Sequence, residues 1–145
     1  MILSMYKFLE LKAGQAMTPD PKSVKPELTL AELEKLFATH DYNAFPVVAE
    51  SEMVGFVTKF DFLKAFTFAP TQMVPHYDEL MQKTVADVMT RAVVHVVDHA
   101  PLPRVLQLMV DLKARSFPVL DDDGKLVGII AREDLMRALK ATALP

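Results

Sequence analysis

The sequence predicts a mixed α/β (α+β) fold built from two copies of one β-α-β-β-α unit. Four blocks recur in the same order, the first two 72 positions apart and the last two 73 positions apart. The blocks are Met17-Thr18 with Met89-Thr90, Phe45-Pro46-Val47-Val48 with Phe117-Pro118-Val119-Leu120, Val54-Gly55-Phe56-Val57 with Val127-Gly128-Ile129-Ile130, and Asp61–Phe66 with Asp134–Leu139. Four ordered matches indicate a duplicated domain rather than chance. The one-residue slip falls between two apolar runs, where a turn absorbs insertions.

Each copy is expected to begin with a short extended piece, at residues 23–25 and 93–97, followed by an amphipathic helix. Apolar residues recur at helical spacing after both pieces, from Leu30 to Phe37 and from Leu102 to Leu112. Thr29 with Glu32 three positions later is typical of a capping box at the start of the first helix. In the second copy Pro101 and Pro103 suit a first helical turn, where a missing N–H costs least.

A hairpin and a closing helix complete each copy. The predicted strands are rich in β-branched residues and cover 45–48 with 53–57, and 117–120 with 126–130. Asp123-Gly124 is a turn signal between the second pair. The closing helices are predicted at 59–68 and 132–142. One such unit leaves apolar helix surface uncovered, so we expect the two copies to pack together.

The repeat sets the domain boundaries. We assign an N-terminal helical lead-in to 1–13, a first motif to 14–68, a connecting segment to 69–83 and a second motif to 84–142. The connecting segment is apolar and longer than a usual loop. It should therefore pack on the protein, for instance as a short helix.

Composition narrows the class of protein. Of 145 residues 51% are hydrophobic, the formal net charge is −3, and cysteine is absent. No basic run suited to a phosphate backbone occurs, so nucleic acid is not an expected partner. No apolar run has the length of a membrane span and no signal peptide is recognisable. We therefore expect a cytoplasmic protein without a membrane partner.

The repeated residues resemble the CBS domain, which would be present twice in this chain. The pattern is Met-Thr, an apolar helix, Phe-Pro-Val, and then Gly followed by two apolar residues and an Asp at the start of a helix. The first set is Ala16-Met17-Thr18, Phe45–Val48 and Gly55–Asp61, and the second is Asp87–Thr90, Phe117–Asp121 and Gly128–Asp134. The resemblance covers residues 14 to 141.

The resemblance implies a tandem CBS pair, or Bateman module, with pseudo-twofold symmetry and two clefts between the motifs. Such modules bind AMP, ADP or ATP, and in some cases S-adenosylmethionine or NAD. They commonly form homodimers and regulate other proteins. The regulated partner is not identifiable from the sequence.

Asp61 and Asp134 are the first candidate ligand-binding residues. The matching aspartate of the family binds the two hydroxyls of a ribose, which suits a carboxylate. Each could instead be a helix N-terminal acid favoured by the helix dipole. Thr58 would cap Asp61 and also meet the ribose. In the second copy Ala131 replaces this threonine, so the two clefts should not be equivalent.

Cations near the same helices are candidates for a ligand phosphate. Arg115 lies three residues before Pro118, where the family often places a basic residue, and Asn43 is its neutral counterpart. Arg132 and Lys59 begin the closing helices, where a cation is unfavourable unless an anion lies near. Arg91 is a weaker candidate. All of these could equally be ordinary surface residues.

Val24 and Val94, with the Phe45/Phe117 pair, are expected to form apolar walls for an adenine, although ordinary strand core explains them equally well. His95 and His99 are four positions apart but fall on a strand and the turn after it, so we expect no metal site.

The predicted function is a small regulatory sensor that binds an adenosine-containing ligand between the two motifs. No Gly-rich phosphate loop, nucleophile elbow or cysteine supports catalysis, so we expect no enzymatic activity and no required cofactor. One alternative is a ligand-free dimerisation scaffold whose interface uses Phe60, Phe62, Phe66 and Phe68. Another is a module that binds S-adenosylmethionine or NAD.

Overall fold

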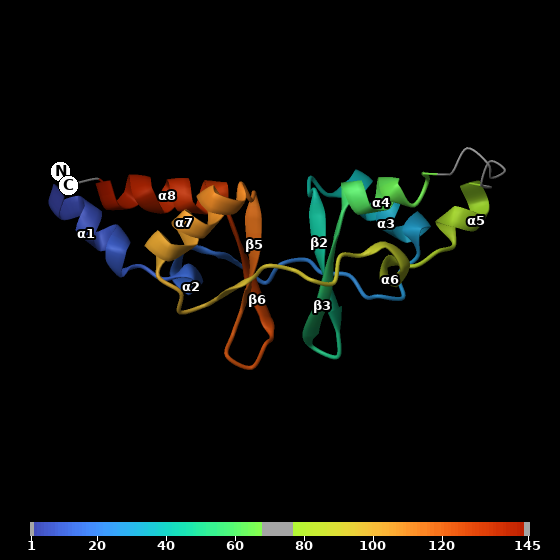
Figure 1. Cartoon of the computed structure of the whole chain (residues 1–145), viewed down its shortest axis with the longest axis horizontal. Coiled ribbons are helices and arrows are strands. Elements are labelled where there is room, and N and C mark those ends of the chain that lie inside the picture. The colour runs from blue at the N-terminus through green and yellow to red at the C-terminus, as the bar shows by residue number, and fades with distance from the viewer. Residues whose placement is uncertain (1, 68–76, 144–145) are drawn as a thin grey trace. The chain divides into compact units, whose positions relative to one another are not determined.

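A computed structural model describes residues 2–67 and 77–143 (Figure 1). The chain divides into two compact units. Unit 1 comprises Met1–Pro21 with Val94–Pro145, and unit 2 comprises Lys22–Val93. The units do not coincide with the repeats 14–68 and 84–142, because each unit includes the first residues of the other repeat: unit 1 includes 14–21, and unit 2 includes 84–93.

Unit 2 is built around a hairpin of β2 (Ala44–Ala49) and β3 (Glu52–Thr58). Val24 adds a parallel bridge to Val47 on one edge, and Thr90 adds an antiparallel bridge to Phe56 on the other. The helices of this unit are α3 (Leu30–Thr39), α4 (Lys59–Lys64), α5 (Tyr77–Met81) and α6 (Val85–Val88).

Unit 1 repeats this plan with longer edges. Its sheet has the order β1-β6-β5-β4, in which β4 runs parallel to β5 and the other pairs are antiparallel. The strands are β1 (Thr18–Pro19), β4 (Val96–Val97), β5 (Ser116–Leu120) and β6 (Leu126–Ala131). The helices are α1 (Ile2–Glu10), α2 (Ala13–Ala16), α7 (Leu102–Leu112) and α8 (Arg132–Ala143).

The beginning of each repeat packs on the other repeat, and we call residues 11–19 and 83–90, which cover these beginnings, the lead-in segments. In unit 1 the Gly14 amide donates to the Asp98 carbonyl and the Leu102 amide donates to the Leu11 carbonyl. In unit 2 the Ala86 amide donates to the Pro26 carbonyl and the Leu30 amide donates to the Lys83 carbonyl. Each of these four residues lies 72 positions from its counterpart in unit 1. The duplication therefore includes how each lead-in segment is held.

A glycine in the second hairpin strand admits each lead-in segment. A Cβ added at Gly55 would lie 2.8 Å from the Thr90 carbonyl oxygen, and one added at Gly128 would lie 2.9 Å from the Thr18 carbonyl oxygen. The same added atoms would meet the sulfur atoms of Met89 and Met17. The repeated Met-Thr and Gly blocks are thus two sides of one close contact.

Each unit has its own apolar core. In unit 2 the core surrounds Phe45, Val47 and Val57, and in unit 1 it surrounds Phe117, Val119 and Ile130, all at most 2% exposed. The phenylalanine of each Phe-Pro-Val block therefore fixes its strand to the helices.

Several predicted elements are confirmed. Thr29 and Glu32 form the capping box of α3, and Gly124 adopts a φ of +81° in the β5–β6 turn. The connecting segment 69–83 contains α5, although 68–76 lie outside the described residues.

The predicted ends of two elements are wrong. The first closing helix ends at Lys64 rather than at 68, because the amides of Ala65, Phe66 and Thr67 bond carbonyls three residues back and tighten the last turn. The predicted strand 93–97 is reduced to Val96–Val97.

Candidate functional site

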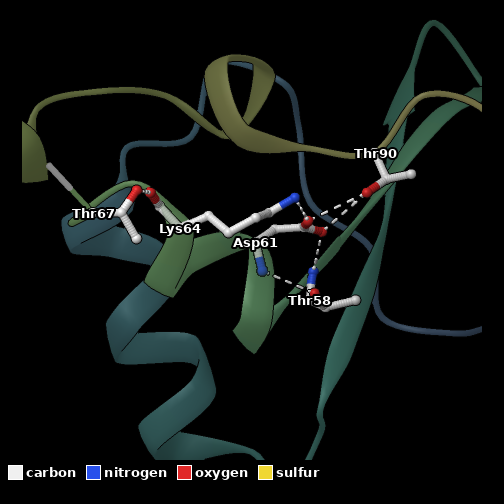
Figure 2. Close-up of polar contacts among 5 residues, drawn as sticks. All are labelled: Thr58, Asp61, Lys64, Thr67 and Thr90. Atoms are coloured by element: carbon white, nitrogen blue, oxygen red, sulfur yellow. Dashed lines mark hydrogen bonds and ion pairs between the residues drawn. The ribbon is translucent and has the colours of Figure 1, made fainter. Parts of the chain in front are cut away.

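A buried carboxylate lies at the start of the closing helix in unit 2 (Figure 2). Asp61 is 3% exposed and occupies the third position of α4. Its Oδ2 accepts from the Thr58 amide at 3.0 Å, and the Thr90 hydroxyl lies 3.2 Å from Oδ1. The Lys64 ammonium lies 3.0 Å from Oδ1. Three donors from three segments thus satisfy a charge that burial alone would disfavour.

Unit 1 holds an equivalent carboxylate. Asp134 is 4% exposed on α8. Its Oδ2 accepts from the Ala131 amide at 2.8 Å, and its Oδ1 accepts from the Thr18 hydroxyl at 3.3 Å. Arg137 Nη1 lies 3.0 Å from the same Oδ1. Both carboxylates therefore have one main-chain donor, one threonine of a lead-in segment and one cation three residues later.

The donors around Asp61 keep it ionised. Burial raises the pKa of its carboxyl, but the hydrogen bond from the Thr58 amide and the hydrogen bond and charge of Lys64 outweigh this. The net result is a pKa below the ordinary value of 3.8. Asp61 is consequently an acceptor for hydroxyl groups across the physiological pH range.

The two helix starts differ as the sequence predicted. Thr58 Oγ1 accepts from the Asp61 amide at 3.0 Å, which completes a capping box on α4. Ala131 has no hydroxyl to accept from the Asp134 amide. The other half of the capping box is kept, because the amide of Ala131 donates to the Asp134 carboxylate at 2.8 Å.

The predicted phosphate-binding positions lie next to these helix starts. The Arg115 carbonyl accepts from the Arg132 amide at 3.1 Å, and the Asn43 carbonyl accepts from the Lys59 amide at 3.0 Å. Arg115 and Asn43 are exposed. The backbone thus places Arg115 beside the α8 start that holds Asp134, and Asn43 beside the α4 start that holds Asp61.

Three other predicted cations have partners within the protein. Arg132 donates from Nε to the Ala114 carbonyl and from Nη2 to the Lys113 carbonyl at the end of α7. The Lys59 ammonium lies 5.8 Å from the Phe37 ring centroid, and Arg91 donates to the Ala86 carbonyl. These contacts explain the three side chains without a ligand, so their role in phosphate binding stays a prediction.

The predicted apolar walls are not equivalent. Val24 is 5% exposed and pairs with Val47, whereas Val94 is 49% exposed. The residue that matches Val24 is Val96, which pairs with Val119 in the same parallel manner. Our pairing of Val24 with Val94 was therefore shifted by two residues. Phe45 and Phe117 are enclosed by core and do not line an open surface.

A hollow of about 300 Å³ lies between β4 and α7 in unit 1. Its polar lining residues are His95 and Arg104, and the others are apolar. Their counterparts 72 positions earlier are Ser23 and Glu32, so this cationic lining belongs to the second repeat alone.

His99 contacts carboxylates rather than His95. Its Nε2 lies 2.9 Å from Asp122 Oδ1, and Asp98 brings a third potential ligand atom within 4.8 Å. The His99 and Asp122 side chains are 58% and 80% exposed. A hydrogen bond between exposed side chains accounts for this proximity, and the expectation of no metal site stays a prediction.

Four residues of the carboxylate sites were missed in the sequence. Thr18 and Thr90 belong to the repeated Met-Thr block, and Lys64 and Arg137 follow the two aspartates at the same spacing. The repeat made all four visible. It did not reveal that each threonine serves the aspartate of the other repeat, which depends on how the lead-in segments are held.

The fold and these paired sites define a duplicated β-α-β-β-α module with one buried, cation-paired aspartate in each unit. The CBS domain model matches residues 13–67 and 85–141. The chain therefore belongs to the CBS domain family, in which it is a tandem pair. No helix among the described residues has the length and apolar character required to cross a membrane.

Curated relatives support this assignment. The chain is 33% identical over 147 residues to the chloroplastic CBS domain-containing protein CBSX1 of Arabidopsis thaliana, covering 86% of this chain and 62% of that protein. It is 30% identical to inosine-5′-monophosphate dehydrogenase of Methanocaldococcus jannaschii, covering 89% of this chain and 24% of the dehydrogenase. The chain thus spans less than two thirds of either relative.

Solved structures resemble the whole module. CBSX2 in complex with AMP is 28% identical, with a TM-score of 0.75 over 90% of this chain and 96% of that one. The CBS domain pair of MJ0100, in complex with 5′-methylthioadenosine and S-adenosyl-L-methionine, is 25% identical, with a TM-score of 0.69 over 90% and 97%.

Proposed function

We propose that this chain is a regulatory module that binds an adenosine-containing ligand, with Asp61 and Asp134 each accepting the hydroxyls of a ribose. The observation that carries the proposal is the pair of buried carboxylates at equivalent helix starts. The AMP complex of CBSX2 and the methylthioadenosine complex of MJ0100 support the ligand class.

The chemistry of the two carboxylates suits a ribose. A hydroxyl that donates to an ionised carboxylate forms a charge-assisted hydrogen bond, which contributes about 1.5–3 kcal/mol. Two vicinal hydroxyls can bind the two oxygens of one carboxylate. Because Asp61 and Asp134 are at most 4% exposed, such bonds would be shielded from competing water.

The units are expected to prefer different adenosine compounds. In unit 1 the guanidinium of Arg115 lies on the segment bonded to the start of α8, so this unit suits a phosphate-bearing ligand such as AMP, ADP or ATP. In unit 2 Asn43 carries no charge. That unit suits adenosine compounds without phosphate, including S-adenosylmethionine, and NAD is a further alternative for the module.

Ligand binding would regulate another protein, and the ligand would not be converted in a reaction. A ligand shifts the conformational equilibrium of the module if it binds two states with different affinities, and a partner protein then responds to the favoured state. We place no catalytic step on the described residues and require no cofactor.

Isothermal titration of the full chain tests the proposal. Adenosine, AMP, ATP, NAD and S-adenosylmethionine are titrated separately, and we expect binding by at least one phosphate-bearing compound. Arg115→Gln should weaken AMP about tenfold and leave adenosine unchanged, because a charged hydrogen bond is lost. No heat and no thermal shift with any of the five compounds would falsify the proposal.

Exposed apolar side chains favour homodimer formation as a second function. Leu63 on α4 and Met136 on α8 occupy matching positions of the repeat and are 62% and 67% exposed. Phe60 is 69% exposed, whereas Phe62 and Phe66 are half-buried and pack on each other, so their place in an interface stays a prediction. Phe68 lies outside the described residues.

Sedimentation equilibrium tests this second function. We expect a dimer that dissociates in Leu63→Ser with Met136→Ser, since each serine removes an apolar contact. A monomer at all concentrations, or a dimer unchanged by both substitutions, would contradict it.

A further inference from the structure

The cation of each carboxylate site occupies a position that a ribose would need. Lys64 Nζ and Arg137 Nη1 both lie 3.0 Å from an Oδ1 of the aspartate three residues earlier. Figure 2 shows Lys64, Thr58 and Thr90 converging on Asp61. A carboxylate offers about four acceptor positions. With three donors in place, about one position is free at each aspartate.

A ribose with two adjacent hydroxyls brings two donors, so one donor already present must leave. The main-chain amides of Thr58 and Ala131 are fixed by the strand-to-helix junctions that they occupy. These two amides cannot withdraw without moving backbone. The backbone of Thr90 is held by reciprocal main-chain hydrogen bonds with Phe56 at 2.8 and 2.9 Å, so its hydroxyl stays beside Asp61 and can only rotate, either donating to the carboxylate or bonding a ribose hydroxyl.

The cations can withdraw without moving backbone. The side chains of Lys64 and Arg137 are 52% and 70% exposed, whereas their partner carboxylates are 4% and 5% exposed. A released ammonium or guanidinium therefore regains water, and a ribose hydroxyl takes its acceptor position on the buried carboxylate. Each cation thus lies between a buried carboxylate and solvent.

We propose that Lys64 and Arg137 are competing counterions that close the two carboxylates in the free protein and must be displaced by a ribose diol. The inference rests on the proposed function, because it concerns the same two aspartates. It assigns the two cations a role opposite to that of a phosphate-binding cation: each one weakens adenosine binding.

A matched pair of ligands isolates the effect. Adenosine has two vicinal ribose hydroxyls and no phosphate, so its affinity does not report phosphate contacts. Its 2′-deoxy analogue brings one donor, which fits the free acceptor position. We expect Lys64→Gln with Arg137→Gln to tighten adenosine about two- to fivefold at low salt. The affinity of 2′-deoxyadenosine should stay the same.

A control for the loss of a positive charge uses Lys140, which lies on α8 and forms no ion pair within the described residues. Lys140→Gln should leave both affinities unchanged, and 0.5 M salt should reduce the gain of the double variant by screening the ion pairs. Thermal melting of each variant without ligand confirms that it folds.

The outcomes separate the two proposals. If the wild type binds adenosine and the double variant binds it equally or less tightly, the competing-counterion role is wrong and the ligand proposal stands. Equal tightening for both nucleosides also overturns it, because a general charge effect is then sufficient. If neither protein binds any adenosine compound, the ligand proposal fails, and the counterion role fails with it.

Discussion

Units 1 and 2 hold the same carboxylate with different surroundings. Asp61 is preceded by Thr58, whose hydroxyl caps α4, whereas Asp134 is preceded by Ala131. Both carboxylates are nevertheless buried, bonded to a main-chain amide and contacted by a lead-in threonine. The difference teaches that backbone and lead-in segment position the acid, and that the capping hydroxyl serves the helix.

Replacing the acid should have the largest effect on this comparison. Asp134→Asn removes the charge from the acceptor in unit 1, so AMP affinity should fall about 10- to 100-fold, since each charge-assisted hydrogen bond contributes about 1.5–3 kcal/mol. Asp61→Asn is the matched control and should change AMP affinity less, because Asn43 offers no phosphate contact in unit 2. Titration calorimetry measures both. Equal losses would show that the units do not differ in ligand preference.

Filling the lead-in contact should be next in size. Gly128→Ala would place a Cβ 2.9 Å from the Thr18 carbonyl oxygen, so the lead-in segment must shift away from Asp134. We expect a loss of about 1–3 kcal/mol in the free energy of unfolding, measured by urea denaturation. Gly124→Ala is not a usable control because its φ is +81°. Gly55→Ala tests the same contact in unit 2, and stability unchanged in both variants would contradict the role of the glycines.

Exchanging the capping residues should sharpen the comparison at about 1 kcal/mol. Thr58→Ala removes the hydroxyl that accepts from the Asp61 amide and should destabilise the protein by about that amount. Ala131→Thr should add a similar bond to α8 and stabilise it. Thermal melting measures both. Should Ala131→Thr leave the melting temperature unchanged, the start of α8 cannot use a capping hydroxyl.

Lowering the pH should give the smallest effect, a change in the difference between the melting temperatures of the wild type and Asp61→Asn. The pKa of Asp61 is lowered in the folded protein, so its ionised form stabilises the fold above the ordinary pKa of 3.8, and this contribution is lost as pH falls below that value. The melting temperature of Asp61→Asn should therefore approach that of the wild type between pH 4 and pH 2.5. A gap of constant size over this range would contradict the assignment.

Much of the fold was predictable because the repeat and local signals agree. The hairpins, the capping box at Thr29 and the turn at Gly124 each follow from residue types that determine local backbone geometry. The early end of α4 was not predictable, since Phe62 and Phe66 continue the helical spacing beyond Lys64, where the hydrogen bonds already reach only three residues back.

The two aspartates of the site were predictable from the sequence, but the residues that donate hydrogen bonds to them were not all predicted. Asp61 and Asp134 stood out by motif, whereas Thr18 and Thr90 contact them through chain segments that sequence order does not bring together. Val94 was paired with Val24 because each lies in the extended piece predicted at the start of its copy, and the parallel pairing with Val119 identifies Val96 as the match. The register between strands that are distant in the sequence decides which residues match, and composition does not reveal this register.

The exchanged lead-in segments also determine when each unit can fold. The Thr90–Asp61 contact joins residues 29 apart, and the Thr18–Asp134 contact joins residues 116 apart. Closing a loop four times longer costs about 1.2 kcal/mol more in chain entropy. Unit 2 is one continuous stretch and can form while the chain is still being synthesised, whereas residues 1–21 must wait for the C-terminal half. During that interval the apolar face of the first lead-in segment has no partner within unit 1, so this segment is made before unit 2 and protected after it.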